Sequence, residues 1–304
     1  MTSSGPPASG REILRALLIV NPGARRASAG QSRATDAFGR AGVACEVIRT
    51  SAPGHATEIA RTRASDFDAV FTLGGDGTAM EVMTAMARSG PPVGILPGGT
   101  GNVLARSFGI PLRIERAVPA LLRGREALID LGRLDDGRHF AIGVGVGLDE
   151  KMIAGASKAM KRRAGVIAYV WSATVALLRM QKFSVRLTVD GKVYEREAAS
   201  VMIANLGDVL GGLLHFGDGI LHDDGLLQAC VYSPRNLRDA FRIFYRMSRG
   251  TAHTDRCVLC IPGREFLLET VPVRRAQADG ELLGETPLAV HVEPNAARLL
   301  LPAR

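Results

Sequence analysis

The 304-residue chain has few aromatic residues, and its basic residues are scattered along the whole chain rather than confined to one stretch. Phe, Trp and Tyr together make up 5% of the sequence, too few for the stacking platforms on which single-stranded nucleic acids bind. The formal net charge of +8 comes from scattered residues, so we expect no nucleic-acid partner. A nucleotide or an acidic membrane surface would fit this charge, although a merely basic protein would show the same excess.

Only four cysteines are present, and Cys257 and Cys260 form the one closely spaced pair, CVLC. The usual zinc sites need a second such pair, and the six histidines show no metal-ligand spacing. The CVLC pair lies in a strand-like run, which favours two structural thiols over a redox pair. The simplest compartment is therefore the reducing cytosol, with peripheral binding to the inner face of the membrane left open.

No run of about 18 residues is both apolar and uncharged, so we expect no transmembrane helix. Residues 1–12 lack the charged start and the long apolar region of a signal peptide, and they predict a disordered lead. Residues 164–178 are apolar and follow four basic residues, which allows either a core helix or a helix at an anionic membrane surface. The arginine-rich segment 237–248 predicts a helix, which would either bind a membrane surface or be a solvated surface helix.

Short apolar runs alternate with helix-like segments up to about residue 130. The strand-like runs cover residues 14–20, 44–49, 68–73 and 93–96. This alternation predicts an α/β domain with a parallel sheet over residues 13–130. Strand-like runs dominate residues 131–292, which predicts a mostly antiparallel second domain. Residues 293–304 are a candidate to pack back on the first domain.

Three loops follow strands of the first domain: the NPG loop (Asn21–Gly23), the GGDGT loop (Gly74–Thr78) and the PGGTGN loop (Pro97–Asn102). All three would lie at the carboxyl edge of the sheet, where open α/β folds bind ligands. Glycines let backbone N–H groups approach phosphate oxygens, and the helix N-termini that follow favour negative charge. The hydroxyls of Thr78 and Thr100 would donate to the same phosphates. The pattern is neither a Walker A loop nor GxGxxG, which disfavours hydride transfer.

Three aspartates allow more than one interpretation. Asp76 lies among phosphate-binding amides, where a carboxylate repels the ligand. It would bridge a divalent cation or hold a hydroxyl, or it would cap the following helix. At Asp224-Gly225 and Asp279-Gly280, the residues alone favour ordinary turns between strands.

Taken together, these motifs resemble the diacylglycerol kinase catalytic-domain family. That family includes sphingosine kinases and bacterial lipid kinases and is distantly similar to NAD kinases. The resemblance runs in order from Asn21 to Pro287. It is carried by the NPG loop, Thr50 with Gly54-His55-Ala56, the GGDGT loop, Glu81, the run Gly94–Arg106, the DDG motif (Asp223–Gly225) with Leu226-Leu227, the DGE motif (Asp279–Glu281) and Thr286-Pro287.

The resemblance implies a two-lobed kinase with ATP in the cleft and a β-sandwich-like second domain. The implied ATP contacts are Asn21, Thr50, Gly74, Gly75, Asp76, Gly77, Thr78, Glu81, Gly99, Thr100 and Asn102. A magnesium ion would be held by Asp224 and the carbonyls of Leu221 and Leu226. The catalytic proton acceptor falls on Asp279 or Glu281, while Asp76 would hold metal-bound water or the substrate hydroxyl.

We therefore expect an ATP- and Mg²⁺-dependent lipid kinase that phosphorylates a hydroxyl of diacylglycerol, a sphingoid base or a related lipid at a membrane surface. Val103 departs from the family, many members of which carry an aspartate at this position. The chain would then rely on Asp76, with Asp130 or Asp149, and the departure weakens the case for simple diacylglycerol.

Two other functions remain open. An NAD kinase-like phosphotransferase shares the GGDG sequence, but this chain lacks the Asn-Glu pair that NAD kinases use at the adenosine. A non-catalytic nucleotide-binding regulator would use the same loops without turnover, and the retention of Asp279 and Glu281 argues against it. The sequence leaves open which lipid accepts the phosphate and whether the chain forms a homodimer.

Overall fold

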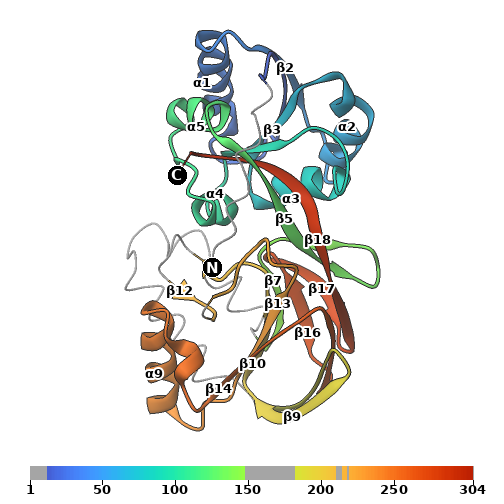
Figure 1. Ribbon diagram of the computed structural model, residues 1–304, viewed down its shortest axis with the longest axis vertical. Coiled ribbons are helices and arrows are strands. Elements are labelled where there is room, and N and C mark those ends of the chain that lie inside the picture. The colour runs from blue at the N-terminus through green and yellow to red at the C-terminus, as the bar shows by residue number, and fades with distance from the viewer. Residues whose placement is uncertain (1–11, 148–181, 210–213, 218, 304) are drawn as a thin grey trace. The chain divides into compact units, whose positions relative to one another are not determined.

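The computed structural model describes residues 12–147, 182–209, 214–217 and 219–303, which form two compact units (Figure 1). Of the described residues, those up to Leu131 and those from Pro294 onward form the first unit, and those within Gly132–Glu293 form the second. The chain leaves the first unit within β5 (Arg125–Leu134) and returns within β18 (Leu288–Leu301). The C-terminal segment therefore belongs to the same unit as the N-terminal sheet.

A parallel sheet forms the centre of the first unit. Its strands follow the spatial order β2 (Ala44–Arg49), β1 (Arg15–Val20), β3 (Ala69–Gly74) and β4 (Val93–Pro97). The C-terminal part of β18 adds to β4 in parallel, with Leu299 opposite Val93. β1, β3 and β4 are almost wholly buried, which explains why each is a continuous apolar run.

Helices cover both faces of this sheet (Figure 1). α1 (Ala27–Arg40) packs with α5 (Ile114–Leu122) on one face, and α2 (His55–Arg63) packs with α3 (Asp76–Ala85) on the other. A Cβ on Gly30 of α1 would lie 2.5 Å from Ile114 Cδ1, so glycine permits the close approach of α1 to α5. α4 (Val103–Ser107) is a short helix after β4.

β2 forms the edge of the parallel sheet, and its residues are exposed or half-buried. Burial raises the pKa of the Cys45 thiol on this strand to about 11, so the thiol stays protonated at neutral pH. All four cysteines are free thiols.

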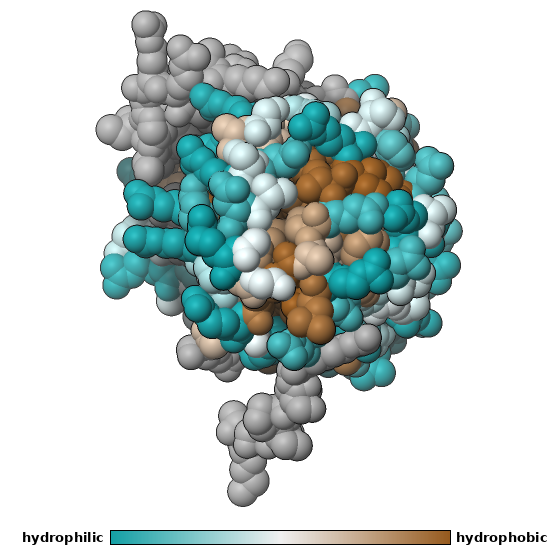
Figure 2. All heavy atoms as spheres, turned by 90° about the horizontal axis from the view of Figure 1, so that it is seen from above, coloured by the Kyte–Doolittle hydropathy of each residue, from teal (hydrophilic) through white to brown (hydrophobic). Residues whose placement is uncertain are grey.

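Seen from above, the protein shows apolar surface between hydrophilic side chains (Figure 2), so this face is not uniformly polar.

The second unit consists mainly of antiparallel strands in two layers. One layer has the order β14 (Val258–Gly263), β13 (Leu227–Tyr232), β10 (Ser200–Ala204), β7 (Gly143–Val146), β16 (Arg275–Ala278) and β17 (Glu281–Glu285). The other joins the N-terminal part of β18 to β15 (Glu265–Val271), β8 (Phe183–Val189) and β9 (Lys192–Ala198). One hydrophobic core contains residues of both layers, such as Val144 and Phe183. The predicted fold class, a parallel α/β domain followed by an antiparallel β-sandwich-like domain, is confirmed.

The remaining elements are short, apart from α9 (Leu237–Ser248), which has the predicted bounds. They are η1 (Ala64–Asp66), β6 (His139–Phe140), β11 (Asp208–Val209), β12 (Leu214–His215) and η2 (Ala252–Thr254). Within the described ranges, no helix combines the length and hydropathy that a bilayer span requires. The predicted helix at residues 164–178 and most of the predicted N-terminal lead lie outside the described residues.

Two of the strand-like runs within residues 131–292, at 139–146 and 194–204, are each divided in the structure. The run 139–146 forms β6 and β7, because the intervening amides of Ala141 and Ile142 donate to the Asp279 side chain instead of to a neighbouring strand. The run 194–204 divides at Ala199, whose N–H donates to the Tyr232 carbonyl. At this point the chain passes from β9 in one layer to β10 in the other.

Candidate functional site

The GGDGT and PGGTGN loops meet at the carboxyl ends of adjacent parallel strands, β3 and β4. The Gly98 N–H donates to the Gly74 carbonyl at 2.8 Å. A Cβ on Gly99 would lie 2.7 Å from the Cα of Gly75, and a Cβ on Gly98 would lie 3.0 Å from the Gly74 nitrogen. Because these neighbours are backbone atoms, no side chain fits between the loops. The contact between the loops thus requires glycine at Gly99, in addition to any role in phosphate binding.

Asp76 connects the two loops. It is the first residue of α3, yet its Oδ1 accepts the backbone N–H of Leu104 at 2.9 Å, in the first turn of α4. The side chain therefore caps the helix of the neighbouring loop rather than its own, which neither sequence interpretation anticipated. Its Oδ2 accepts no hydrogen bond from the residues that the structure describes, and it remains available to a ligand.

Three other predicted ATP contacts hold the loops in shape. Asn21 Nδ2 donates to Thr78 Oγ1 at 3.0 Å, and Thr78 is 6% exposed. Asn102 has φ 48° and ψ 47°, a left-handed conformation that asparagine tolerates. Its side chain accepts the Gly99 N–H at 2.9 Å and donates to the Gly99 carbonyl at 3.1 Å. Direct contact of these side chains with ATP stays a prediction.

Thr50 and Glu81 lie beside the start of α2. Thr50 follows β2, and its N–H donates to the Val20 carbonyl at 2.8 Å. Glu81, on α3, accepts the Ala56 N–H at 3.1 Å through Oε2 and thereby caps α2. Thr100 is exposed at the tip of the PGGTGN loop.

The start of α3 can bind an anion. The N–H groups of Asp76, Gly77 and Thr78 occupy the first helical turn, where backbone donors have no acceptor within the helix. The helix dipole adds partial positive charge at the same place. Backbone donors beside a glycine-lined contact are suited to the phosphates of a nucleotide.

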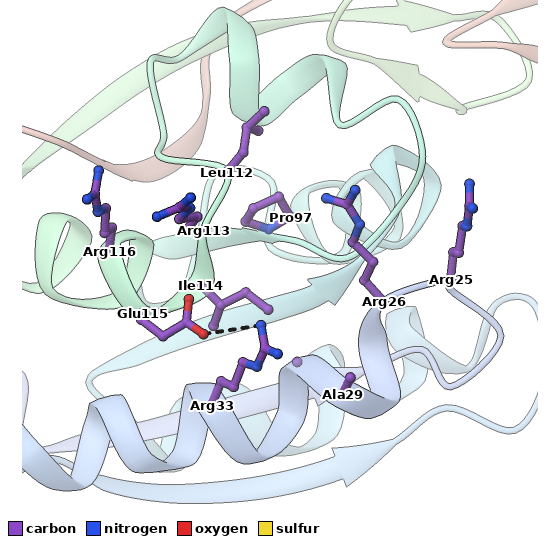
Figure 3. A pocket seen from close by; sticks show the side chains of 11 residues that line it. Arg25, Arg26, Ala29, Arg33, Pro97, Leu112, Arg113, Ile114, Glu115 and Arg116 are labelled. Carbon is purple, nitrogen blue, oxygen red and sulfur yellow. Dashed lines mark ion pairs between the residues drawn. The ribbon is translucent and has the colours of Figure 1, made fainter. Parts of the chain in front are cut away.

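A basic pocket of about 660 Å³ lies between α1 and α5 (Figure 3). Five arginines line it: Arg25, Arg26, Arg33, Arg113 and Arg116. Arg33 points to Glu115, with 3.3 Å between Nη1 and Oε1, while the other four have no acidic partner in the described part of the chain. The Arg26 N–H donates to the Gly98 carbonyl at 3.0 Å, so the pocket adjoins the PGGTGN loop. This pocket was not predicted from the sequence, although two consecutive arginines, Arg25 and Arg26, stand one residue after the NPG loop.

In the second unit, Asp279 and Gly280 form the turn between β16 and β17. Their φ angles are 49° and 89°, the pattern of a two-residue hairpin turn. The Asp279 carboxylate accepts three backbone N–H groups, from Ala141 at 2.8 Å and from Ile142 and Gly143 at 3.0 Å each. The turn interpretation is therefore correct, and both carboxylate oxygens serve the fold.

Glu281 differs from Asp279 although it is only two residues further along. It begins β17, it is exposed, and its side chain makes no hydrogen bond to any described residue. Of the two candidate proton acceptors, Glu281 is the one whose carboxylate is exposed and unused by the hairpin.

The predicted magnesium ligands lie in the loop before β13. Asp224 Oδ1 accepts the Leu226 N–H at 3.0 Å, and Leu221 is 55% exposed. Across the described residues, no three His, Cys, Asp or Glu side chains form a metal-binding group. One carboxylate and two backbone carbonyls nevertheless supply the hard oxygen atoms that Mg²⁺ prefers, so the donor set fits this ion.

Asp130 and Asp149 were the two aspartates predicted to replace the aspartate that many family members carry at the position of Val103. Asp130 is fully buried and accepts the Asn295 N–H at 2.7 Å through Oδ1. It therefore serves the fold of the first unit. Asp149 lies outside the described residues.

Comparisons with known proteins agree with this architecture. Residues 15–134 match the description "Diacylglycerol kinase catalytic domain", and residues 143–301 match "YegS C-terminal NAD kinase beta sandwich-like domain". A crystal structure of a "putative diacylglycerol kinase" from Bacillus anthracis str. Sterne is 25% identical, with a TM-score of 0.81 over 96% of this chain and 98% of that chain.

Curated relatives are similarly distant in sequence. A "Putative lipid kinase" from Staphylococcus aureus (strain MRSA252) is 29% identical over 247 residues, which is 79% of each chain. An uncharacterized protein of Synechocystis sp. is 26% identical over 238 residues, and the match spans 77% of this chain but only 54% of that longer relative. Together with the two domain matches, these results show that the chain belongs to the family that joins a diacylglycerol kinase catalytic domain to a YegS-type, NAD kinase-like β-sandwich domain.

Proposed function

We propose that this protein is an ATP-dependent lipid kinase that transfers the γ-phosphate to a hydroxyl of diacylglycerol or a related lipid, such as a sphingoid base. The observation that carries the proposal is the direct contact between the two glycine loops beside the first turn of α3. This arrangement offers backbone N–H donors and one available carboxylate oxygen, on Asp76, at a single point of the sheet edge.

ATP would bind through its phosphates at this point. The amides of Asp76, Gly77 and Thr78 would hold the phosphate oxygens, while Thr50 and Glu81 lie beside the start of α2, where the nucleoside would extend. Asn21 and Asn102 would act indirectly, because their side chains bond to Thr78 and Gly99 within the loops.

Glu281 would take the proton of the acceptor hydroxyl. As that oxygen forms its bond to the γ-phosphorus, the bond from the γ-phosphorus to the bridging oxygen breaks and ADP leaves. The proton passes to the Glu281 carboxylate, which Asp279 keeps in place by fixing the hairpin to residues 141–143. Asp279 is thus a positioning residue in this proposal, rather than the proton acceptor.

Asp224, with the carbonyls of Leu221 and Leu226, would hold Mg²⁺ in the second unit. A bound Mg²⁺ supplies charge neutralisation for phosphate oxygens. Asp76 Oδ2, beside the phosphate-binding amides, would orient metal-bound water or the acceptor hydroxyl.

A second candidate acceptor is NAD, because the second unit matches a domain described as NAD kinase beta sandwich-like. The two candidates differ in the chemistry of the acceptor and not in the nucleotide site. A single assay can therefore separate them.

The test is transfer of radiolabelled γ-phosphate from ATP, with Mg²⁺, to a panel of dispersed diacylglycerol, sphingoid base and other lipid alcohols, with NAD in a parallel reaction. We expect label in a lipid for the natural protein and none for Glu281→Gln. The matched control is Glu285→Gln, at the other end of β17. Glu285 Oε1 lies 3.8 Å from Arg275 Nε. Label in NAD alone would contradict the lipid kinase, and ATP binding without label in any acceptor would favour a regulator.

A further inference from the structure

One side of α9 is fixed firmly to the second unit. Ile243 is 5% exposed and packs in a cluster with Cys230 and Cys257. Arg242 Nη1 lies 2.6 Å from Asp239 Oδ1, and Arg242 Nε lies 2.6 Å from Asp255 Oδ2. Both aspartates are buried. These contacts determine which face of α9 is turned to the protein and which to solvent.

The opposite side carries a row of large apolar residues. Leu237, Phe241 and Tyr245 are four residues apart and therefore lie along one face of the helix, here called the α9 face. Their exposed fractions are 46%, 51% and 61%. Single exposed apolar residues are common on proteins, but three in register on one helix form an apolar row of the kind that interaction sites present.

Positive charge surrounds the α9 face. Between residues 235 and 256 the chain has six arginines, two aspartates, and neither lysine nor glutamate. Arg242, Arg246 and Arg256 form ion pairs with these two aspartates. The exposed charge beside the row therefore comes from residues such as Arg238 and Arg249. The Arg249 guanidinium lies 5.8 Å from the centre of the Tyr245 ring, which joins the basic residues to the apolar row.

We propose that the α9 face binds the surface of an anionic phospholipid bilayer. Leu237, Phe241 and Tyr245 would enter the boundary between headgroups and acyl chains, and the arginines would contact headgroup phosphates. The inference rests on the proposed function insofar as a lipid kinase meets its acceptor at such a surface. The charge favours a bilayer over a second copy of this chain, because a symmetric pairing of α9 faces would bring like-charged arginines together.

The test is co-sedimentation of the full chain with vesicles of phosphatidylcholine, with and without phosphatidylglycerol, in the absence of ATP and acceptor. We expect the protein to sediment with the phosphatidylglycerol vesicles, and binding to fall about tenfold in Phe241→Ser and in Tyr245→Ser, since each change removes one large apolar contact. The matched control is Val193→Ser on β9, where the exposed fraction is 51%. Arg238→Gln should weaken binding to anionic vesicles and reduce its dependence on salt.

Equal sedimentation of the α9 variants and the natural protein would overturn the proposal. The proposal would also be overturned if Phe241→Ser bound vesicles as the natural protein does but no longer formed a dimer. That result would assign the α9 face to contacts between copies of the chain. Vesicle binding is measured without turnover, so its outcome is separate from the outcome of the kinase assay. Unfolding temperatures serve as the check of folding, and we expect them to match because the substituted side chains are exposed.

Discussion

At the scale of single residues, Asp279 and Glu281 contrast most clearly. Three backbone N–H groups from residues 141–143 point at the Asp279 carboxylate, while Glu281 makes no side-chain hydrogen bond to a described residue. Residues of the same chemical type in one motif thus carry different tasks. Asp279 closes the hairpin on the neighbouring loop, and Glu281, in the proposed mechanism, takes the proton of the acceptor hydroxyl.

Stability measurements should separate these two tasks. Asp279→Ala leaves three N–H groups without their acceptor, so we expect the free energy of unfolding to fall by about 3 kcal/mol. Glu281→Gln removes no such bond and should change it by less than about 0.5 kcal/mol while abolishing phosphate transfer. Urea unfolding of both variants checks this prediction. An Asp279→Ala protein as stable as the natural one would show that the three hydrogen bonds do not hold the hairpin.

The contact between the glycine loops leads to a second residue-scale prediction. In Gly99→Ala, the new Cβ would meet the Gly75 Cα at 2.7 Å, so the loops must separate. We expect a loss of about 1–3 kcal/mol of stability and a clear loss of ATP affinity, measured by calorimetry.

Gly39→Ala is the control for this substitution. Gly39 lies in α1 with no atom within 4 Å of the added Cβ, so alanine should leave ATP affinity unchanged and stabilise the helix by about 0.5–1 kcal/mol. Equal ATP affinity in Gly99→Ala and the natural protein would contradict the role assigned to the contact between the loops.

The sequence predicted which residue types gather at the site, but not their partners. The glycines and helix starts of the GGDGT and PGGTGN loops follow from local rules. The bond from Asp76 to Leu104 could not be predicted in this way, because the two residues are 28 positions apart and meet only through the pairing of β3 with β4. The same holds for Asp279, whose partners are more than 130 positions away.

At the scale of elements, α9 shows where local signals suffice. Its predicted and observed bounds agree, and Asn236 caps it by accepting the Asp239 N–H at 3.0 Å. β18 shows where they fail, because Pro294 and Asn295 look like the end of a strand. The strand continues to Leu301, with Asn295 at φ 54° and its N–H accepted by the buried Asp130, a partner 165 positions away.

The ion pairs under α9 predict a dependence of stability on pH. The Arg242 guanidinium holds the pKa of the Asp255 carboxyl below its usual value of 3.8, and it lowers the pKa of Asp239 in the same way. A pKa lowered by folding contributes stability above the unfolded-state value, and this stability is lost as pH falls through the folded-state value. We therefore expect the unfolding temperature to vary little between about pH 5 and pH 7. It should decrease when the pH is lowered beneath about 4.

Asp255→Asn tests this prediction by thermal unfolding across pH. The variant should be less stable at neutral pH and should lose less stability on acidification, because its side chain cannot be protonated. Asp66→Asn is the control, since the one ion pair of Asp66 with a described residue is exposed, with 3.7 Å between its Oδ2 and Arg63 Nε. If Asp255→Asn and the natural protein lost the same stability between pH 5 and pH 3, the network would not be the source of the acid sensitivity.

At the scale of the whole molecule, the proposed tasks are divided between the two units. The first supplies the glycine loops and the start of α3, and the second supplies the DGE motif, the proposed magnesium ligands and the α9 face. Nucleotide binding and phosphate transfer should therefore respond to different substitutions. A ligand that binds the folded state raises stability by about 2.7 kcal/mol at a concentration one hundred times its dissociation constant, so ATP binding is visible as a shift in unfolding temperature.

The most direct test measures this shift and the labelling of lipid by γ-phosphate on the same preparations of the natural protein and Glu281→Gln. The account predicts that ATP with Mg²⁺ raises the unfolding temperature of both proteins equally, and that only the natural protein labels a lipid alcohol. Labelling by Glu281→Gln at the natural rate would contradict the role of Glu281. ATP stabilisation of the natural protein without labelled lipid would contradict the lipid kinase itself.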